Sequence, residues 1–125
     1  MSFSGPQLPP PPSWFASGGI DRRKLDDYLL SPTHPDGKHK LRLWDRVFGI
    51  GVGDGKLLER LILQQVASGV VTERPPHIDA RRFGVVIPAF QGRSGRGPVL
   101  TAWASDHGDY KTLRPRLVTA FPIVE

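Results

Sequence analysis

The sequence contains no cysteine, which excludes a disulfide framework and every metal site built on thiolates. No hydrophobic run approaches the roughly 20 residues that a helix needs to cross a bilayer, so we expect no membrane partner. The proline-rich start lacks the basic-then-apolar layout of a signal peptide, and we expect a cytoplasmic site of action. At 125 residues, the chain has the length of one domain that can bury a core.

The chain does have an excess of positive charge. Lys and Arg number 17 against 12 Asp and Glu, a net charge of +5 at pH 7. This balance favours polyanions or acidic proteins as partners, and the partner we expect is RNA, tRNA included. An acidic immunity or antitoxin protein would suit the same charge.

The first 19 residues differ in composition from the rest. Prolines occupy positions 9–12, a run that takes extended, polyproline-like backbone. We therefore expect residues 1–19 to form a flexible tail and residues 20–125 to form a single domain. Trp14 and Phe15 interrupt the tail, and two interpretations stay open. The rings either pin the tail to the domain surface or form a docking peptide for a partner.

Helix signals precede strand signals along the domain. Asp21 is a good N-cap for a first helix, Pro35 suits the first turn of a second, and Asp54 can cap a third. Runs rich in β-branched and aromatic residues follow at 70–74, 83–88, 98–105 and 116–121. This order predicts an α+β fold, with N-terminal helices packed on a four-stranded, mainly antiparallel sheet.

The segment from His34 to Lys40 concentrates side chains that could bind a phosphate. Pro35 fixes the backbone beside His34, so we expect the imidazole at a helix entrance, where unpaired backbone N–H groups favour anions. Lys38 and Lys40 add positive charge in the same stretch. A second interpretation stays open, in which His34 only caps the helix and Lys40 is a solvated charge.

The histidines do not indicate a metal site. His34 and His39 are five residues apart, whereas two ligands on one helix face need a spacing of about three or four residues. His77 and His107 stand apart from them in the sequence. We therefore expect neither a metal nor another cofactor.

Alternation along the third strand candidate puts Thr101 and Trp103 on one face. We expect the neighbours Leu100 and Ala102 to pack on the helices, which leaves Trp103 on the open face as a platform for stacking a base. Covering of Trp103 by the proline-rich tail stays open as an alternative.

Two pairs of residues could add phosphate contacts. Arg93 and Arg96 lie in a Gly-rich segment that is either a phosphate clamp or simply a soluble loop. Arg116 and Thr119 belong to the last strand candidate but have opposite parity, so a regular strand sends them to opposite faces. Both can serve one site only if a β-bulge intervenes.

Several short motifs resemble an uncharacterised bacterial domain family. That family has a Lys-Leu-x-x-Tyr-x-Leu stretch, a His-Pro-x-Gly-x-x-Lys-Ala motif with a nearby aromatic, a Thr-x-Trp strand and a Pro-Arg-Leu-x-Thr strand. The matching positions are Lys24, Leu25, Tyr28, His34, Pro35, Gly37, Lys40, Trp44, Thr101, Trp103, Pro115, Arg116, Leu117 and Thr119. The chain departs from the pattern at Leu41, where Ala is usual, and at Trp44, where Phe is usual.

The resemblance implies an activity. Domains of this kind occur alone and as C-terminal modules of polymorphic and phage-associated toxins. They are similar to the barnase–EndoU–colicin–RelE class of metal-independent ribonucleases. The resemblance therefore implies an endoribonuclease toxin domain that a secreted or phage-borne carrier could deliver.

The expected chemistry is attack of an RNA 2′-hydroxyl on the adjacent phosphate, which yields a 2′,3′-cyclic phosphate. Such a reaction needs acid–base catalysis and cationic stabilisation of a charged phosphorane. The expected catalytic residues are His34 as acid/base, Lys40 and Arg116 as charge stabilisers, and Thr101 or Thr119 as hydrogen-bond donor. The expected RNA-binding residues are Trp103, Arg93, Arg96 and Lys38. A non-catalytic RNA- or protein-binding module and a phage structural accessory protein remain as alternatives.

Overall fold

The computed structural model describes residues 9–78, 80–106 and 113–124. In chain order the elements are η1 (Pro12–Ser17), α1 (Arg22–Lys24), η2 (Leu25–Leu29), α2 (Gly37–Phe48), α3 (Gly55–Gln65), η3 (Val66–Ser68), β1 (Val70–His77), β2 (Ala80–Gln91), β3 (Arg96–Asp106) and β4 (Arg116–Pro122). The strands form one four-stranded sheet in the order β1-β2-β3-β4, and every neighbouring pair is antiparallel. The predicted α+β fold is confirmed.

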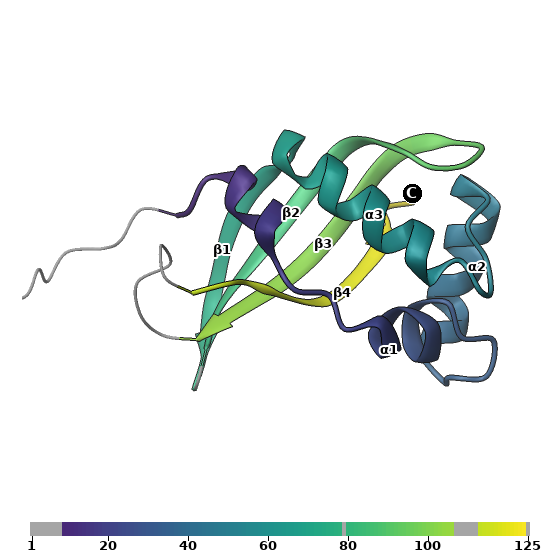
Figure 1. Ribbon diagram of the computed structural model, residues 1–125, viewed down its shortest axis with the longest axis horizontal. Coiled ribbons are helices and arrows are strands. Elements are labelled where there is room, and N and C mark those ends of the chain that lie inside the picture. Colours follow the sequence, from purple (N-terminus) through teal and green to yellow (C-terminus); the bar gives the residue numbers. More distant parts are fainter. Residues whose placement is uncertain (1–8, 79, 107–112, 125) are drawn as a thin grey trace, which may run out of the picture.

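The helices pack against one face of the sheet. α3 lies across this face, while α2 packs beside β4 (Figure 1). The core between the two layers includes Trp44 and Phe48 from α2 and Phe83 and Trp103 from the sheet, all at most 1% exposed. The opposite face of the sheet carries exposed side chains such as that of Arg82 and is open.

The third strand follows the predicted alternation, but its faces are the reverse of those expected. Thr101 is 0% exposed and Trp103 is 1% exposed, so both point into the core. Leu100 and Ala102 point to the open face instead. Burial of the large indole removes more apolar surface from water than burial of Ala102 would. The indole N–H does not oppose this burial because it donates to Thr101 Oγ1 at 2.7 Å.

Packing begins ahead of Ile20. Phe15, in η1, is 0% exposed, and its ring contacts those of Trp14, Phe83 and Trp103 at centroid distances of 5.0, 5.6 and 5.5 Å. Trp14 Nε1 donates to the carbonyl of Leu113 at 3.1 Å. Rings that the sequence places in the proline-rich segment therefore belong to the central aromatic cluster.

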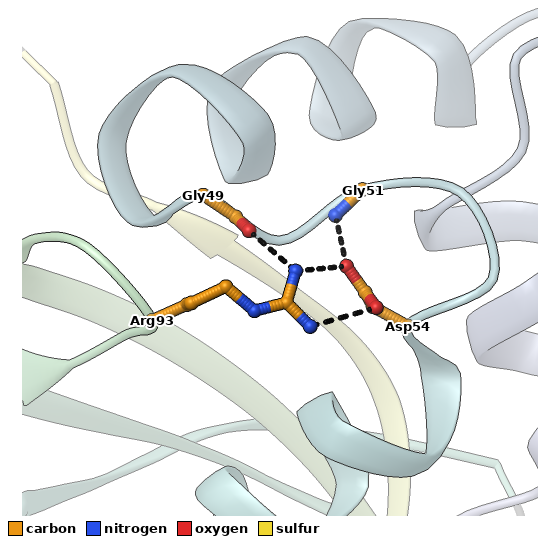
Figure 2. Close-up of polar contacts among 4 residues, drawn as sticks. All are labelled: Gly49, Gly51, Asp54 and Arg93. Carbon is orange, nitrogen blue, oxygen red and sulfur yellow. Dashed lines mark hydrogen bonds and ion pairs between the residues drawn. The ribbon is translucent and has the colours of Figure 1, made fainter.

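Asp21 and Asp54 were both predicted to cap helices, but only the Asp21 carboxylate accepts a hydrogen bond from its helix. Asp21 accepts a hydrogen bond from the Arg23 N–H at 2.9 Å and begins α1, as predicted. Asp54 occupies the N-cap position of α3, but its side chain makes no cap hydrogen bond. It accepts instead from the Gly51 N–H and from Arg93 (Figure 2).

Both edges of the sheet are partly closed. The edge strand β1 contains Pro75 and Pro76, which have no N–H to offer and are tolerated at an edge. At β4, the Leu117 N–H donates to the carbonyl of Gly19 at 3.0 Å. Trp44 Nε1 donates to the carbonyl of Ala120 at 3.3 Å.

Candidate functional site

Three arginines line up across the open face of the sheet. Arg74 on β1 pairs with Arg82 on β2. Arg82 in turn pairs with Ala104 on β3, which pairs with Arg116 on β4. Directly opposed residues of an antiparallel sheet share a face, so the three exposed guanidinium groups form one row, which we call the basic row.

The basic row borders a hollow of about 550 Å³ on the open face, the sheet hollow. It is lined by Arg74, His77, Ala80, Arg82, Phe83, Leu100, Ala102, Trp103, Ala104, Arg116, Val118, Thr119 and Phe121. Gly84 lets the Arg74 guanidinium lie against the sheet, because a Cβ there would lie 2.9 Å from Arg74 Nε. The sheet hollow thus combines cationic side chains with an apolar floor.

A β-bulge brings Arg116 and Thr119 to the same face. The pairing of β4 with β3 shifts by one residue between Leu117 and Thr119, and Val118 is left out of it. The extra residue restores Thr119 to the face of Arg116, while Leu117 stays buried in the core. Both Arg116 and Thr119 line the sheet hollow, so the condition that the sequence set for a shared site is met.

Arg116 does not carry a free charge. Its Nη1 lies 3.2 Å from Oδ1 of Asp106. The two side chains are 56% and 70% exposed, so solvent screens the pair and its contribution to stability is small. A phosphate could therefore compete with Asp106 for this guanidinium.

A second hollow, of about 400 Å³, adjoins the first. Its lining consists of Tyr28, Asp36, His39, Lys40, Leu43 and Phe121, and we call it the helix hollow. Phe121 also lines the sheet hollow, so the two hollows meet at this ring. Lys40 Nζ donates to the Tyr28 hydroxyl at 2.5 Å and lies 5.8 Å from the centre of the Phe121 ring.

The Tyr28 hydroxyl is electrostatically perturbed. Partial burial raises its pKa, but the hydrogen bond from Lys40, the nearby Thr119 hydroxyl and the Lys40 charge outweigh burial. The pKa of Tyr28 is therefore lowered from its ordinary value of 10.0. Thr119 Oγ1 is buried and makes no hydrogen bond of standard geometry within the described part of the chain.

His34 caps α2 with its ring. Nδ1 accepts the N–H of Asp36 at 3.1 Å and the N–H of Gly37 at 3.0 Å. An acceptor nitrogen carries no proton, so the ring proton of neutral His34 is on Nε2. The imidazole also packs edge-on against the Tyr28 ring, at a centroid distance of 4.7 Å. The structure thus gives His34 the capping role that stood as the alternative interpretation.

Gly37 explains the spacing of this motif. A Cβ at Gly37 would lie within 1.8 Å of the Tyr28 carbonyl oxygen, so only glycine allows α2 to begin against that backbone. Lys40 follows one turn later, which directs its ammonium to the Tyr28 hydroxyl. The His-Pro-x-Gly-x-x-Lys stretch therefore positions Lys40 and Tyr28 relative to each other.

Two expected site residues are corrected by burial. Thr101 Oγ1 donates to the carbonyl of Val85 at 2.9 Å and accepts from Trp103, so it cannot reach a phosphate from the core. Trp103 offers no exposed ring face for a base, because all but 1% of it is buried. Phe121 is the half-buried aromatic ring that borders both hollows.

The expected cationic contacts in the loops are also revised. Arg93 is bound by Asp54 and by the carbonyl of Gly49, so its guanidinium joins two loops and is not a free phosphate clamp (Figure 2). Arg96 and Lys38 are exposed but belong to the lining of neither hollow. His107 lies outside the described residues.

Sequence reasoning missed the role of Arg74, Arg82, His77 and Tyr28. Arg74 and Arg82 flank the turn between the first two strands, and hairpin pairing places them opposite each other. A regular hairpin would not have predicted this pair, because the register of β1 against β2 shifts by one residue between Arg74 and His77. His77 reaches the sheet hollow only because β1 extends past its two prolines.

Within residues 9–78, 80–106 and 113–124, no three His, Asp or Glu side chains cluster as metal ligands would. In the same residues no helix is long and apolar enough to span a membrane.

The fold and the two hollows define an α+β domain with a basic, open sheet face. The chain belongs to the family described as a domain of unknown function, DUF6883, which matches residues 16–124. No curated protein and no solved structure matches the chain. The match to an uncharacterised domain family agrees with the resemblance drawn from the motifs.

Proposed function

We propose that this domain is a metal-independent endoribonuclease of the toxin type that binds RNA on its open sheet face. The observation that carries the proposal is the basic row beside the sheet hollow, which adjoins the Lys40–Tyr28 pair at Phe121. Cationic side chains supply most of the affinity for a phosphate backbone.

The length of the basic row suits a single RNA strand. Neighbouring strands lie about 4.8 Å apart, so the row from β1 to β4 spans about 14 Å. A row of this length can contact more than one phosphate of a bound RNA strand. Phe121, on the same face of β4 as Arg116 but farther along the strand and opposite Leu100, offers an aromatic face on which a base can stack.

Cleavage would take place where the two hollows meet. Lys40 reaches this junction from α2 and would stabilise the charge that develops on phosphorus, while Arg116, opposite Ala104 and farther along β4, would hold a flanking phosphate in the sheet hollow. The buried Thr119 hydroxyl, which lacks a partner of standard geometry among the described residues, would hydrogen-bond a non-bridging oxygen. None of these roles needs a metal ion.

The test is cleavage of purified tRNA and rRNA with and without excess EDTA. We expect cutting in both conditions and products that end in a 2′,3′-cyclic phosphate. Strict dependence on a divalent ion would overturn the mechanism. The double variant Arg74→Gln/Arg82→Gln should bind RNA more weakly, whereas Arg42→Gln/Arg46→Gln, two exposed changes on α2, is the charge-matched control.

A non-catalytic RNA-binding module is the second candidate. It is favoured by one observation: the two cap hydrogen bonds occupy His34 Nδ1, so the expected acid/base residue is committed to structure. RNA that binds and is never cut would decide for this candidate. With either function, an acidic immunity or antitoxin protein would block the site by covering the basic row.

A further inference from the structure

We propose that Tyr28 is the general base of the reaction, with its hydroxyl oxygen taking the proton of the RNA 2′-hydroxyl; this assignment rests on the proposed function. Tyr28 comes from η2, Lys40 from α2 and Thr119 from β4. The three side chains meet at the Tyr28 hydroxyl, at the junction of the two hollows.

The position of the hydroxyl supports a role beyond packing. Tyr28 and Lys40 are only half-buried, and both line the helix hollow, so a ligand in that hollow can reach them. Thr119 Oγ1 is buried beside them without a well-formed hydrogen bond in the described chain. The Thr119 hydroxyl has one proton, which it can give either to the Tyr28 oxygen, whose pKa it lowers, or to a bound phosphate oxygen.

The rest of the motif fixes the ring of Tyr28. The His34 imidazole packs edge-on against it, while Gly37 lets the start of α2 reach its backbone. His34 is accordingly a positioning residue in this arrangement. Its two cap hydrogen bonds hold the imidazole in place next to the phenol.

Electrostatics favour the phenolate that a base requires. The Lys40 ammonium donates a hydrogen bond to the Tyr28 hydroxyl. The pKa of Tyr28 is lowered as a result, despite the opposing effect of burial. The other titratable groups around Tyr28 are Asp36, whose charge raises the pKa of the phenol, together with His34 and His39. The net direction is still toward the ionised form.

Protons and electron pairs balance in this step. The 2′-oxygen gives its proton to the Tyr28 phenolate and uses an electron pair to form the bond to phosphorus. The bond from phosphorus to the 5′-oxygen breaks, its electron pair stays on that oxygen, and water supplies the proton. The Tyr28 phenol then returns its proton to solvent, while Lys40 stays protonated throughout.

The experiment compares Tyr28→Phe and Lys40→Met in the full chain, with Tyr110→Phe as the control. Tyr28→Phe should keep its melting temperature and bind RNA within about twofold of wild type, while its cleavage rate falls about 10²–10⁴-fold. Lys40→Met should move the pH–rate profile to higher pH. The chain has two tyrosines, so in Tyr110→Phe the tyrosinate absorbance reports Tyr28 alone.

The wild-type rate should rise with pH and level off where that absorbance shows Tyr28 ionising. Cleavage by a folded Tyr28→Phe at the wild-type rate would overturn the assignment and leave the ribonuclease proposal intact. Wild-type protein that binds RNA without cutting it would overturn both. If Tyr28→Phe does not fold, the pH profile of Lys40→Met decides, and an unshifted profile rejects Tyr28 as the base.

Discussion

The Asp54 carboxylate binds the Arg93 guanidinium through two hydrogen bonds, of 2.9 and 3.0 Å (Figure 2). The same guanidinium donates to the Gly49 carbonyl at 3.1 Å, and the Gly51 N–H donates to the same carboxylate at 2.8 Å. These contacts join the connection between α2 and α3 to the hairpin loop between β2 and β3. Arg93, which was expected from the sequence to bind RNA, thus holds these two loops together.

The stability that Asp54 provides should depend on pH. Arg93 and then the Gly51 N–H hold the pKa of Asp54 below its ordinary value of 3.8. A lowered pKa means that the carboxylate stabilises the fold above that value and loses this effect as pH falls through its folded pKa. Melting temperatures measured from about pH 2.5 to pH 7 should show Asp54→Asn below wild type at neutral pH, with the gap closing in acid.

The charge-loss control for this measurement is Arg60→Gln, on the exposed surface of α3. It should show no such closing gap. A difference between Asp54→Asn and wild type that stays constant across the range would contradict the ion pair.

Gly37→Ala should disrupt the start of α2. The new methyl would lie within 1.8 Å of the Tyr28 carbonyl oxygen, so the backbone must move. We expect a loss of stability in urea unfolding together with a loss of RNA cleavage, because Lys40 shifts away from Tyr28. Gly97→Ala is the matched control: a Cβ there meets nothing within 4 Å, and the change should be neutral. Equal behaviour of the two variants would refute the close approach.

His34→Ala and His34→Asn separate capping from catalysis. Loss of a helix cap costs about 0.5–2 kcal/mol, so His34→Ala should lower the free energy of unfolding by that amount. Asn can accept the same backbone N–H groups and should recover most of the loss. We expect His34→Asn to cleave RNA at close to the wild-type rate. A stable His34→Asn variant without activity would show that the imidazole itself takes part in the chemistry.

Phe15→Ala should be strongly destabilising. The ring is 0% exposed, and removing a buried phenylalanine side chain costs about 3–5 kcal/mol. Chemical denaturation followed by tryptophan fluorescence measures this loss. Val52→Ala, at a side chain that is 65% exposed, should change stability by less than about 0.5 kcal/mol. A small effect at Phe15 would mean that the η1 segment is not part of the cooperative unit.

The salt dependence of RNA binding should report how many phosphates the basic row neutralises. For single-stranded RNA, each phosphate that a cationic side chain neutralises adds about 0.7 to the slope of log K against log salt. Arg82→Gln should reduce the slope by that amount, whereas the exposed Arg46→Gln on α2 should not. Asp106→Asn should bind RNA more tightly than wild type, because it releases Arg116 from its ion pair. Unchanged binding in both Arg82→Gln and Asp106→Asn would place the RNA elsewhere.

Sequence patterns predicted the elements well because they follow from local chemistry. β-branched and aromatic runs separated by Gly and Pro marked all four strands, and the observed strands extend the predicted ones by only a few residues at most ends. The start of α1 followed from Asp21 for the same reason. Such signals need no knowledge of what lies across the fold.

The orientation of the third strand could not be predicted in this way. Alternation says that Thr101 and Trp103 share a face, but which face meets the helices depends on the whole core. Phe15, remote in sequence, contacts the Trp103 ring and adds apolar surface to that side. Which face of β3 is buried is therefore decided by tertiary packing, and this packing reverses the orientation expected from the sequence.

Predicting the candidate site would have required, even more than the strand orientation, contacts between residues that are distant in the sequence. Lys40 and Arg116 were selected from sequence, but the partner of Lys40 is Tyr28, twelve residues earlier. Arg116 joins Arg82 only through the register of three strands. The sequence could show that Arg116 and Thr119 need a β-bulge to share a face. It could not predict that the bulge occurs at Val118, because nothing in this stretch of β-branched residues distinguishes that position.

The partly closed edges of the sheet limit how other chains can join it. A strand that adds to an edge must find free backbone donors and acceptors. On β1 two prolines remove donors, and on β4 the backbone groups of Leu117 and Ala120 are taken by Gly19 and Trp44. These positions disfavour edge-to-edge polymerisation of the folded domain, so concentrated solutions should resist growth of fibrils from the native state. A partner must then recognise side chains on the face of the sheet, and its choice depends on their chemistry.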